Sequence, residues 1–193
     1  MTTLLNVDFD DEQGVHRKLT RKEVLHYTQV VAGAGNETTG RLIGWLAKVL
    51  AEHPDQRREV ERDRSLLIPA IDETLRFETT GPHLARWLTR DFEAYGQAVP
   101  AGSAVLLLFG AANRDPRRFE NPDAFDIHRI NSHLTFGKGV HYCLGANLAR
   151  LEGRVALDEL LNRWQEWDID YDTAELAPTS TVRGWERLRI VLR

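Results

Sequence analysis

The sequence contains one cysteine, Cys143, among its 193 residues, so no disulfide can form within the chain. It also lacks the roughly 18 consecutive apolar residues of a membrane-spanning helix, and its first residues lack a basic segment followed by an apolar one. We therefore expect a cytoplasmic protein with no membrane association. The lone cysteine must be a buried apolar residue, a nucleophile or a metal ligand.

An excess of one charge is also missing, since 25 Lys and Arg residues stand against 29 Asp and Glu residues, for a net charge of -4. This balance excludes the basic surface typical of proteins that bind nucleic acids. Hydrophobic residues make up 42% of the chain, as in ordinary globular proteins, and no internal repeat is found. The length predicts a single domain over residues 1–193.

Helical signals dominate the first part of the chain. Thr20 and Glu23 have the spacing of a capping box, and no proline follows until Pro54, which predicts a helix of about thirty residues. Its apolar residues form more than one stripe, which predicts burial on several sides. They are Leu25, Val30, Val31, Leu42, Ile43, Trp45, Leu46, Val49 and Leu50. Residues 1–19 show no periodic pattern, and we expect no stable element there.

Later segments predict shorter helices and strands. We expect surface helices over residues 54–63 and from about Pro69 to before Gly81, then a small antiparallel sheet within residues 85–108. Residues 110–142 have little periodicity and predict a long irregular stretch. Apolar residues at helical spacing after Cys143 predict a second substantial helix, and the tail has strand-like segments. The fold class is thus mainly α with small antiparallel β sheets.

Residues 136–145, here called the cysteine loop, read Phe-Gly-Lys-Gly-Val-His-Tyr-Cys-Leu-Gly. The glycines allow sharp bends, and the cysteine stands just before a predicted helix. The unpaired N–H groups at a helix start favour a thiolate, the state that a metal ligand requires. From the residues alone, Cys143 could also be an inert buried side chain, or a nucleophile activated by His141.

The long predicted helix contains the run Ala-Gly-Asn-Glu-Thr-Thr at residues 34–39. Gly35 destabilises a helix by about 1 kcal/mol relative to alanine, so we expect a group that packs close to the backbone there to offset this cost. Ala34 and Thr38 share one helix face, where a flat ligand could lie beside a hydroxyl group. Tight helix packing is an alternative reading of the small residues, and an acid such as Glu37 is usually solvated.

Two further features involve charged residues. Glu73 and Arg76 stand at i and i+3 in a predicted helix, a pairing worth only a few tenths of a kcal/mol on an exposed surface. Arg129 lies in the irregular stretch. Arg86 is next to the expected sheet edge, and an ordinary surface arginine is an equally good reading of it.

These motifs, in this order, resemble the C-terminal half of a soluble bacterial cytochrome P450, together with the run Ala-Ala-Asn-Arg-Asp-Pro at residues 111–116. The resemblance implies that Cys143 is the axial thiolate ligand of the iron in haem b. By the same resemblance, Phe136 packs beside the sulfur, Gly139 and Gly145 let the loop lie against the haem, and His141 meets a propionate. A thiolate ligand favours O–O cleavage.

The resemblance also assigns roles to the other motifs. Ala34 and Gly35 would let the haem approach the long helix, and Glu37 and Thr38 would relay protons during oxygen activation. Arg86 would bind a propionate. Glu73, Arg76 and Arg129 would form a buried ion network that fixes the irregular stretch and has no catalytic part.

The implied activity is monooxygenation of a small organic substrate, in which one atom of O2 enters the substrate and the other leaves as water. Electrons would come from NAD(P)H through a ferredoxin reductase and a ferredoxin. Segments expected to border the substrate are Val30, Ala34, Thr38, residues 80–84 and residues 180–182. Family members are roughly twice as long, so we expect a fold without the N-terminal half. The alternative is a truncated, non-catalytic remnant or interaction protein that forms no closed haem pocket.

Overall fold

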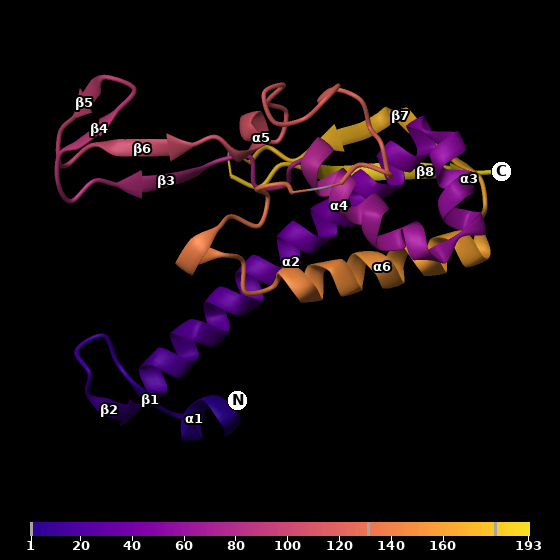
Figure 1. Ribbon diagram of the computed structural model, residues 1–193. Coiled ribbons are helices and arrows are strands. Elements are labelled where there is room, and N and C mark those ends of the chain that lie inside the picture. Colours follow the sequence, from indigo (N-terminus) through magenta and orange to yellow (C-terminus); the bar gives the residue numbers. More distant parts are fainter. Residues whose placement is uncertain (1, 131, 180) are drawn as a thin grey trace. The chain divides into compact units, whose positions relative to one another are not determined.

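The computed structural model describes residues 2–130, 132–179 and 181–193, so one predicted substrate-bordering position, residue 180, lies outside the described residues. The contacts within the chain divide it into a first unit that ends at Glu37 and a second unit, Thr38–Arg193. Helices and small two-stranded antiparallel sheets make up both units (Figure 1), which confirms the predicted fold class. No helix in the described ranges is long and apolar enough to span a membrane.

The first unit contains a short helix and a hairpin before the long helix begins. These elements are α1 (Thr2–Asn6), β1 (Asp8–Asp10) and β2 (His16–Lys18), followed by α2 (Arg21–Glu52). Arg17 on β2 donates to both carboxylate oxygens of Glu23 at 3.0 Å and to Asp11 at 2.9 Å. The expectation that residues 1–19 hold no stable element was wrong, because Arg17 pairs with acids that have no periodic pattern.

The start of α2 follows its sequence signal. The backbone N–H and the hydroxyl of Thr20 donate to Glu23 at 2.7 and 2.9 Å, and the Glu23 N–H donates to the Thr20 hydroxyl at 3.3 Å. Hydrogen bonds from Arg17 and then Thr20 lower the pKa of Glu23 to about 2. The capping box is confirmed.

Burial changes along α2. Leu46, Val49 and Leu50 belong to the buried core of the second unit, whereas Val30 and Val31 in the first unit are exposed. The predicted burial on several sides was therefore wrong for the first half of the helix, where Leu25 is exposed as well. An apolar period identifies a helix face that another segment could bury, but it does not show which segment packs on that face.

Helices form the core of the second unit. They are α3 (Pro54–Arg62), the 3-10 turn η1 (Arg64–Leu66), α4 (Leu67–Phe77) and α6 (Ala146–Arg163). A Cβ on Gly153 of α6 would lie 3.5 Å from Ile71 of α4 and 3.6 Å from Leu42 of α2, so this glycine permits close helix packing. We expected α4 to be a surface helix, and this was wrong because most of its side chains are buried.

Among its described residues, the second unit has three antiparallel strand pairs: β3 (Leu84–Trp87) with β6 (Ala104–Leu107), β4 (Phe92–Ala94) with β5 (Gln97–Val99), and β7 (Trp167–Leu176) with β8 (Trp185–Leu192). The β4–β5 hairpin lies at the tip of the β3–β6 ribbon (Figure 1). Between β6 and α6 the described residues, 108–130 and 132–145, are irregular apart from α5 (Phe109–Ala112) and the 3-10 turn η2 (Gly139–His141). The predicted sheet and irregular stretch are confirmed.

Candidate functional site

The cysteine loop forms a compact turn immediately before α6. The Cys143 N–H donates to the Phe136 carbonyl at 2.8 Å, and the Tyr142 N–H donates to the Gly139 carbonyl at 3.0 Å. Gly137 and Gly139 adopt φ values of 72° and 73°, a region that L side chains enter only at a cost. The loop glycines therefore permit the bends that bring Cys143 to the start of a helix.

Cys143 is exposed, and apolar side chains surround it in the sequence. Val140 is 98% exposed and Leu144 is 75% exposed, fractions unusual for apolar residues in a folded loop. A Cβ on Gly145 would lie 3.9 Å from the Cys143 sulfur, whereas a Cβ on Gly139 would meet nothing within 4 Å. An uncovered sulfur among apolar side chains and glycines suits a flat apolar group with a metal at its centre, so these residues fit a haem.

Phe136 connects the loop to the helices. Its ring lies 4.7 Å from the guanidinium carbon of Arg150 on α6, and Arg150 Nε donates to Asp72 Oδ1 on α4 at 2.7 Å. His133 Nε2 lies 3.4 Å from the same carboxylate oxygen. The sequence reasoning missed these three charged or polar residues, because no local spacing connects residue 72 with residues 133 and 150.

The predicted ion network of Glu73, Arg76 and Arg129 joins α4 to the irregular stretch. Arg76 donates from Nε and Nη2 to the two Glu73 oxygens at 2.8 and 2.7 Å, and Arg129 Nε lies 3.3 Å from Glu73 Oε1. The Glu73 and Arg76 side chains are buried. The structure thus confirms the buried network and excludes the alternative of an exposed helix pair.

Both arginines of the ion network hold the irregular stretch through backbone carbonyls. Arg76 donates to the carbonyls of Asn113, Pro122 and Ala124 at 2.8–2.9 Å. Arg129 donates to the carbonyl of Glu120 at 2.7 Å. A segment without regular structure has no ladder of its own to satisfy these carbonyls, so the guanidinium groups replace it.

Asn113 is a structural residue whose role the sequence reasoning did not assign, although it lies within the motif at residues 111–116. Its buried side-chain amide donates to the hydroxyls of Thr79 and Thr135 at 2.8 and 2.9 Å. The side-chain oxygen Oδ1 of Asn113 accepts the Leu134 N–H at 2.7 Å. Asn113 therefore ties the segment before the cysteine loop to the end of α4.

The predicted residues of the long helix all lie on α2, in two different units. Ala34, Gly35 and Glu37 are exposed and belong to the first unit, whereas Thr38 is half-buried and belongs to the second. Within the helix these residues occupy one continuous turn. Their roles toward a cofactor stay predictions.

The two residues predicted to bind propionates lie on β3 and in η2. Arg86 is half-buried on β3, paired opposite Val105, and its Nη1 donates to the Ala85 carbonyl at 3.0 Å. His141 is exposed in η2, two residues before Cys143. A propionate role for either residue stays a prediction.

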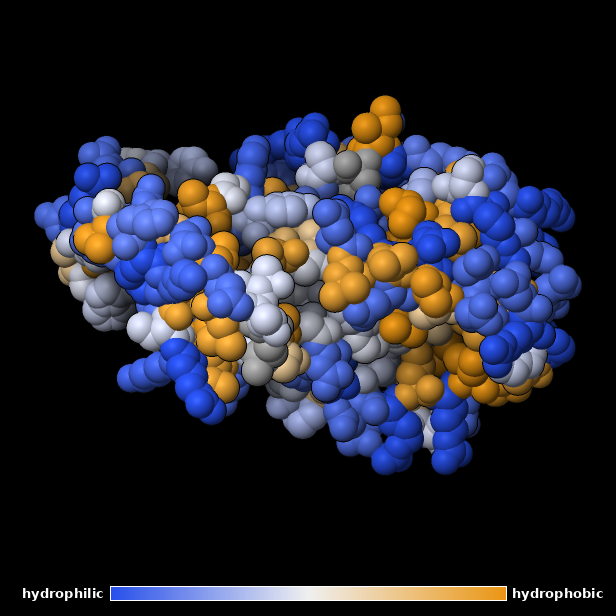
Figure 2. Space-filling view, turned by 90° about the horizontal axis from the view of Figure 1, so that it is seen from below, coloured by the Kyte–Doolittle hydropathy of each residue, from blue (hydrophilic) through white to orange (hydrophobic). Residues whose placement is uncertain are grey.

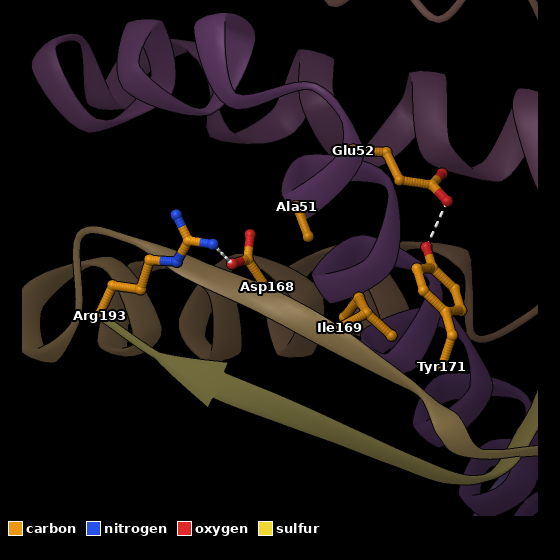
Figure 3. A pocket seen from close by; sticks show the side chains of 6 residues that line it. All are labelled: Ala51, Glu52, Asp168, Ile169, Tyr171 and Arg193. Carbon is orange, nitrogen blue, oxygen red and sulfur yellow. Dashed lines mark hydrogen bonds and ion pairs between the residues drawn. The ribbon is translucent and has the colours of Figure 1, made fainter.

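A hollow of about 370 Å³ lies elsewhere in the second unit, between the end of α2 and the β7–β8 sheet (Figure 3). Its charged groups are already paired, Glu52 with the Tyr171 hydroxyl and Asp168 with Arg193. Burial, and then the contact with Glu52, raises the pKa of Tyr171. None of its lining residues belongs to the predicted site, so it does not compete with the cysteine loop.

Comparison with known proteins agrees with this geometry. The family model described as Cytochrome P450 matches residues 1–182. The chain belongs to the cytochrome P450 family. Its fold is similar to that of HmtN, a hydroxylase of himastatin biosynthesis, with a TM-score of 0.91 and 38% identity over 98% of this chain and 50% of that one.

Curated P450 relatives give the same picture. Putative cytochrome P450 123 of Mycobacterium bovis is 41% identical over 175 residues, which cover 90% of this chain and 44% of the relative. The cytochrome P450 monooxygenase PikC of Streptomyces venezuelae is 39% identical over 186 residues, 93% of this chain and 44% of the relative. The chain thus spans about half the length of the curated P450 relatives it matches. The family implies a haem cofactor.

Proposed function

We propose that the chain carries the thiolate half of a P450 haem site, in an enzyme that inserts one atom of O2 into a small organic substrate. The observation that carries this proposal is the exposed residue Cys143, held just before α6 by a loop in which the Phe136 carbonyl accepts the Cys143 N–H. When bound, a thiolate-ligated haem supplies oxygen activation, because the sulfur donates electron density that favours O–O cleavage.

The residues of this chain would hold the haem in distinct ways. Cys143 would supply a thiolate ligand to the iron, and Phe136 would pack beside the sulfur. Gly139 and Gly145 have no side chain that could separate the loop from the macrocycle. His141 and Arg86 would donate hydrogen bonds to the two propionates, because charge-assisted pairs with carboxylates are the strongest hydrogen bonds available there.

The residues of the α2 run would contribute to haem binding and to proton transfer. Ala34 and Gly35 present little side-chain volume, so a flat ligand can approach the backbone. Glu37 and Thr38 would hold and pass protons while oxygen is reduced. Replacing Thr38 with Ala should raise the share of oxygen reduced without substrate turnover, and an unchanged product yield would contradict the relay.

Electrons would reach the haem from NAD(P)H through a ferredoxin reductase and a ferredoxin. The substrate would lie near Val30, Ala34, Thr38 and residues 80–84. Pro82 backbone approaches Gly110 in this region, and the Gly110 N–H donates to the Pro82 carbonyl at 2.9 Å. The segment therefore has a defined path past the start of the irregular stretch.

Haem binding tests the proposal directly. The purified chain is incubated with haem b, excess haem is removed by gel filtration, and the ratio of haem to protein is measured. We expect close to one haem per wild-type chain. The same treatment of Cys143→Ala should leave far less, because the loop then offers no iron ligand, and equal retention by both proteins would contradict the proposal.

A second candidate is a non-catalytic interaction protein that uses the same fold. This function is favoured by an apolar face on α6, where Leu148, Leu151 and Val155 are exposed. Leu144, just before the helix, is exposed as well. Figure 2 shows hydrophobic side chains gathered on the side of the molecule where α6 lies. Exposed apolar patches of this kind mark contacts with other chains. A chain that binds no haem but forms a stable complex would support this function.

A further inference from the structure

The cysteine loop is attached to the helical core through Phe136. Side chains 138–144 are exposed, whereas the ring of Phe136 is partly buried and packs against the core cluster. The carbonyl of the same residue accepts the N–H of Cys143 at 2.8 Å. The position of the cysteine backbone therefore depends on where the Phe136 residue is held.

Three side chains contact the Phe136 ring. The ring of Tyr142, inside the cysteine loop, lies 6.3 Å away, and the other two side chains come from outside the loop. The guanidinium carbon of Arg150 lies 4.7 Å from the ring centroid, a cation–π distance, and the His133 ring lies 5.5 Å away at an interplanar angle of 52°. Arg150 comes from α6, and His133 precedes the loop. These contacts fix the ring against sliding along the core.

Both side chains converge on one oxygen atom, Oδ1 of Asp72. Arg150 Nε lies 2.7 Å from it and His133 Nε2 lies 3.4 Å from it. His133 Nδ1 accepts the Thr135 N–H at 3.2 Å, so the proton of a neutral ring is on Nε2, where it can point to Asp72. The carboxylate thus orients a guanidinium and an imidazole at once.

The charge of this oxygen is stabilised in the fold. Burial acts to raise the pKa of Asp72, but hydrogen bonds from His133 and Arg150 outweigh it and hold the pKa below its ordinary value. Burial likewise acts to lower the pKa of Arg150, and hydrogen bonds with Tyr142 and Asp72 leave it raised. At neutral pH the pair is a charged, half-buried bridge between α4 and α6.

We propose that Asp72 is a positioning residue for the thiolate ligand, acting through Arg150 and His133 on Phe136 and through Phe136 on the backbone of Cys143. The inference rests on the proposed function for its meaning, but its geometry does not involve the haem. Glu73, the residue after Asp72, has a different role, because it binds Arg76 and Arg129 of the ion network. Consecutive carboxylates on α4 thus brace the cysteine loop and the irregular stretch separately.

The test measures the hydrogen–deuterium exchange rate of the Cys143 backbone amide by NMR, in the haem-free 193-residue chain. Asp72→Asn keeps the shape of the side chain and removes its charge. We expect the Cys143 amide to exchange roughly tenfold faster, the scale of one weakened charge-assisted contact. The Trp164 amide, which donates to Leu160 at the far end of α6, should be unchanged.

Asp158→Asn is the matched control. Asp158 is on α6, as Arg150 is, and pairs with Arg64 of η1 at 3.5 Å. Asp158→Asn therefore breaks an ion pair between helical elements away from Phe136. This variant should leave the Cys143 amide at its wild-type rate. An unchanged rate in Asp72→Asn, or an equal rise in both variants, would overturn the proposal.

Arg150→Lys carries the test if Asp72→Asn fails to fold, as judged by circular dichroism. Lysine keeps the charge beside Asp72 but loses the planar group over the Phe136 ring. The Cys143 amide should again exchange faster than in the wild type, by a smaller factor. A wild-type rate in a folded Arg150→Lys chain would contradict the proposed route.

A spectroscopic measurement connects the inference to the ligand. In haem-loaded, reduced samples under carbon monoxide, Asp72→Asn should shift intensity from the red-shifted Soret band of thiolate ligation to an unshifted band, and Asp158→Asn should not. Equal band ratios in wild type and Asp72→Asn would overturn the positioning role. A wild-type chain that takes up no haem would instead contradict the proposed function, and the amide measurement would still decide the role of Asp72.

Discussion

The backbone N–H of Cys143 donates to the carbonyl of Phe136, seven residues earlier, at 2.8 Å. This bond closes the cysteine loop, so the residue expected to hold iron is fixed by the residue whose ring is packed into the core. Lys138, Val140 and His141 between them are exposed, whereas the Tyr142 ring lies 6.3 Å from the Phe136 ring. The loop therefore combines a fixed sulfur with an open surface.

The bends of the loop should depend on glycine. Gly137→Ala places a Cβ where φ is 72°, and we expect a loss of about 1–2 kcal/mol in the free energy of unfolding. Gly40→Ala is the matched control, because Gly40 is inside α2 with nothing within 4 Å of an added Cβ, and it should gain up to about 1 kcal/mol. Urea unfolding of both variants measures the difference. Equal stabilities would contradict the strained position of Gly137.

The ion network should contribute strongly to stability. Arg76→Ala leaves the Glu73 carboxylate buried without its main partner and removes donors from three carbonyls, so we expect a loss of about 3–5 kcal/mol. The control is Arg163→Ala, since Arg163 and Glu159 form an exposed pair, and its change should stay below about 1 kcal/mol. Denaturant unfolding compares the two. A small loss in Arg76→Ala would show that the network is dispensable.

Gly35 is expected to lower the stability of α2 and to leave room for the haem. Gly35→Ala adds a better helix former with no atom within 4 Å of the new Cβ, so stability should rise by about 1 kcal/mol. If the haem lies against this residue, the same change should reduce the haem retained after gel filtration. Gly33→Ala, on the same helix and equally unobstructed, should gain stability without losing haem. Equal haem retention by the two variants would contradict the role of Gly35.

The stability that Asp72 contributes should depend on pH in one direction. Because hydrogen bonds hold its folded-state pKa below the usual value near ~4, its contribution is present above that value and is lost as the pH falls through the lowered pKa. Wild type should therefore lose more stability on acidification than Asp72→Asn, which has no carboxylate at this position. Urea midpoints at neutral pH and at increasingly acidic pH measure the gap. A gap that stays constant would contradict the coupling.

Local signals predicted much of this fold. Thr20 with Glu23 and the proline at Pro54 delimited the long helix, and the glycine at Gly145 stands where α6 begins. Each of these residues acts on backbone groups within one turn, so its effect can be read from adjacent sequence. The same locality explains why the bends of the cysteine loop and the position of Cys143 just before a helix were predicted, whereas the role of Cys143 as an iron ligand stays a prediction.

Long-range pairing was predicted only where the family resemblance supplied it. Arg129 was assigned to Glu73 in this way, although 56 residues separate them. Asp72 and Arg150 are 78 residues apart, and nothing in either neighbourhood indicates the other. The hairpin before residue 20 was missed for another reason: Arg17 lies only six residues from Asp11 and from Glu23, but these ion pairs form no apolar period that the sequence could show. Charged pairs distant in sequence leave no periodic trace.

The central claim is that Cys143 binds haem iron as a thiolate. The most direct measurement is the absorption spectrum of the haem-loaded chain after reduction under carbon monoxide, compared with Cys143→His, which offers a nitrogen ligand at the same position. We predict a strongly red-shifted Soret band for the wild type and an unshifted band for Cys143→His. An unshifted band in a wild-type chain that retains haem would contradict thiolate ligation by Cys143.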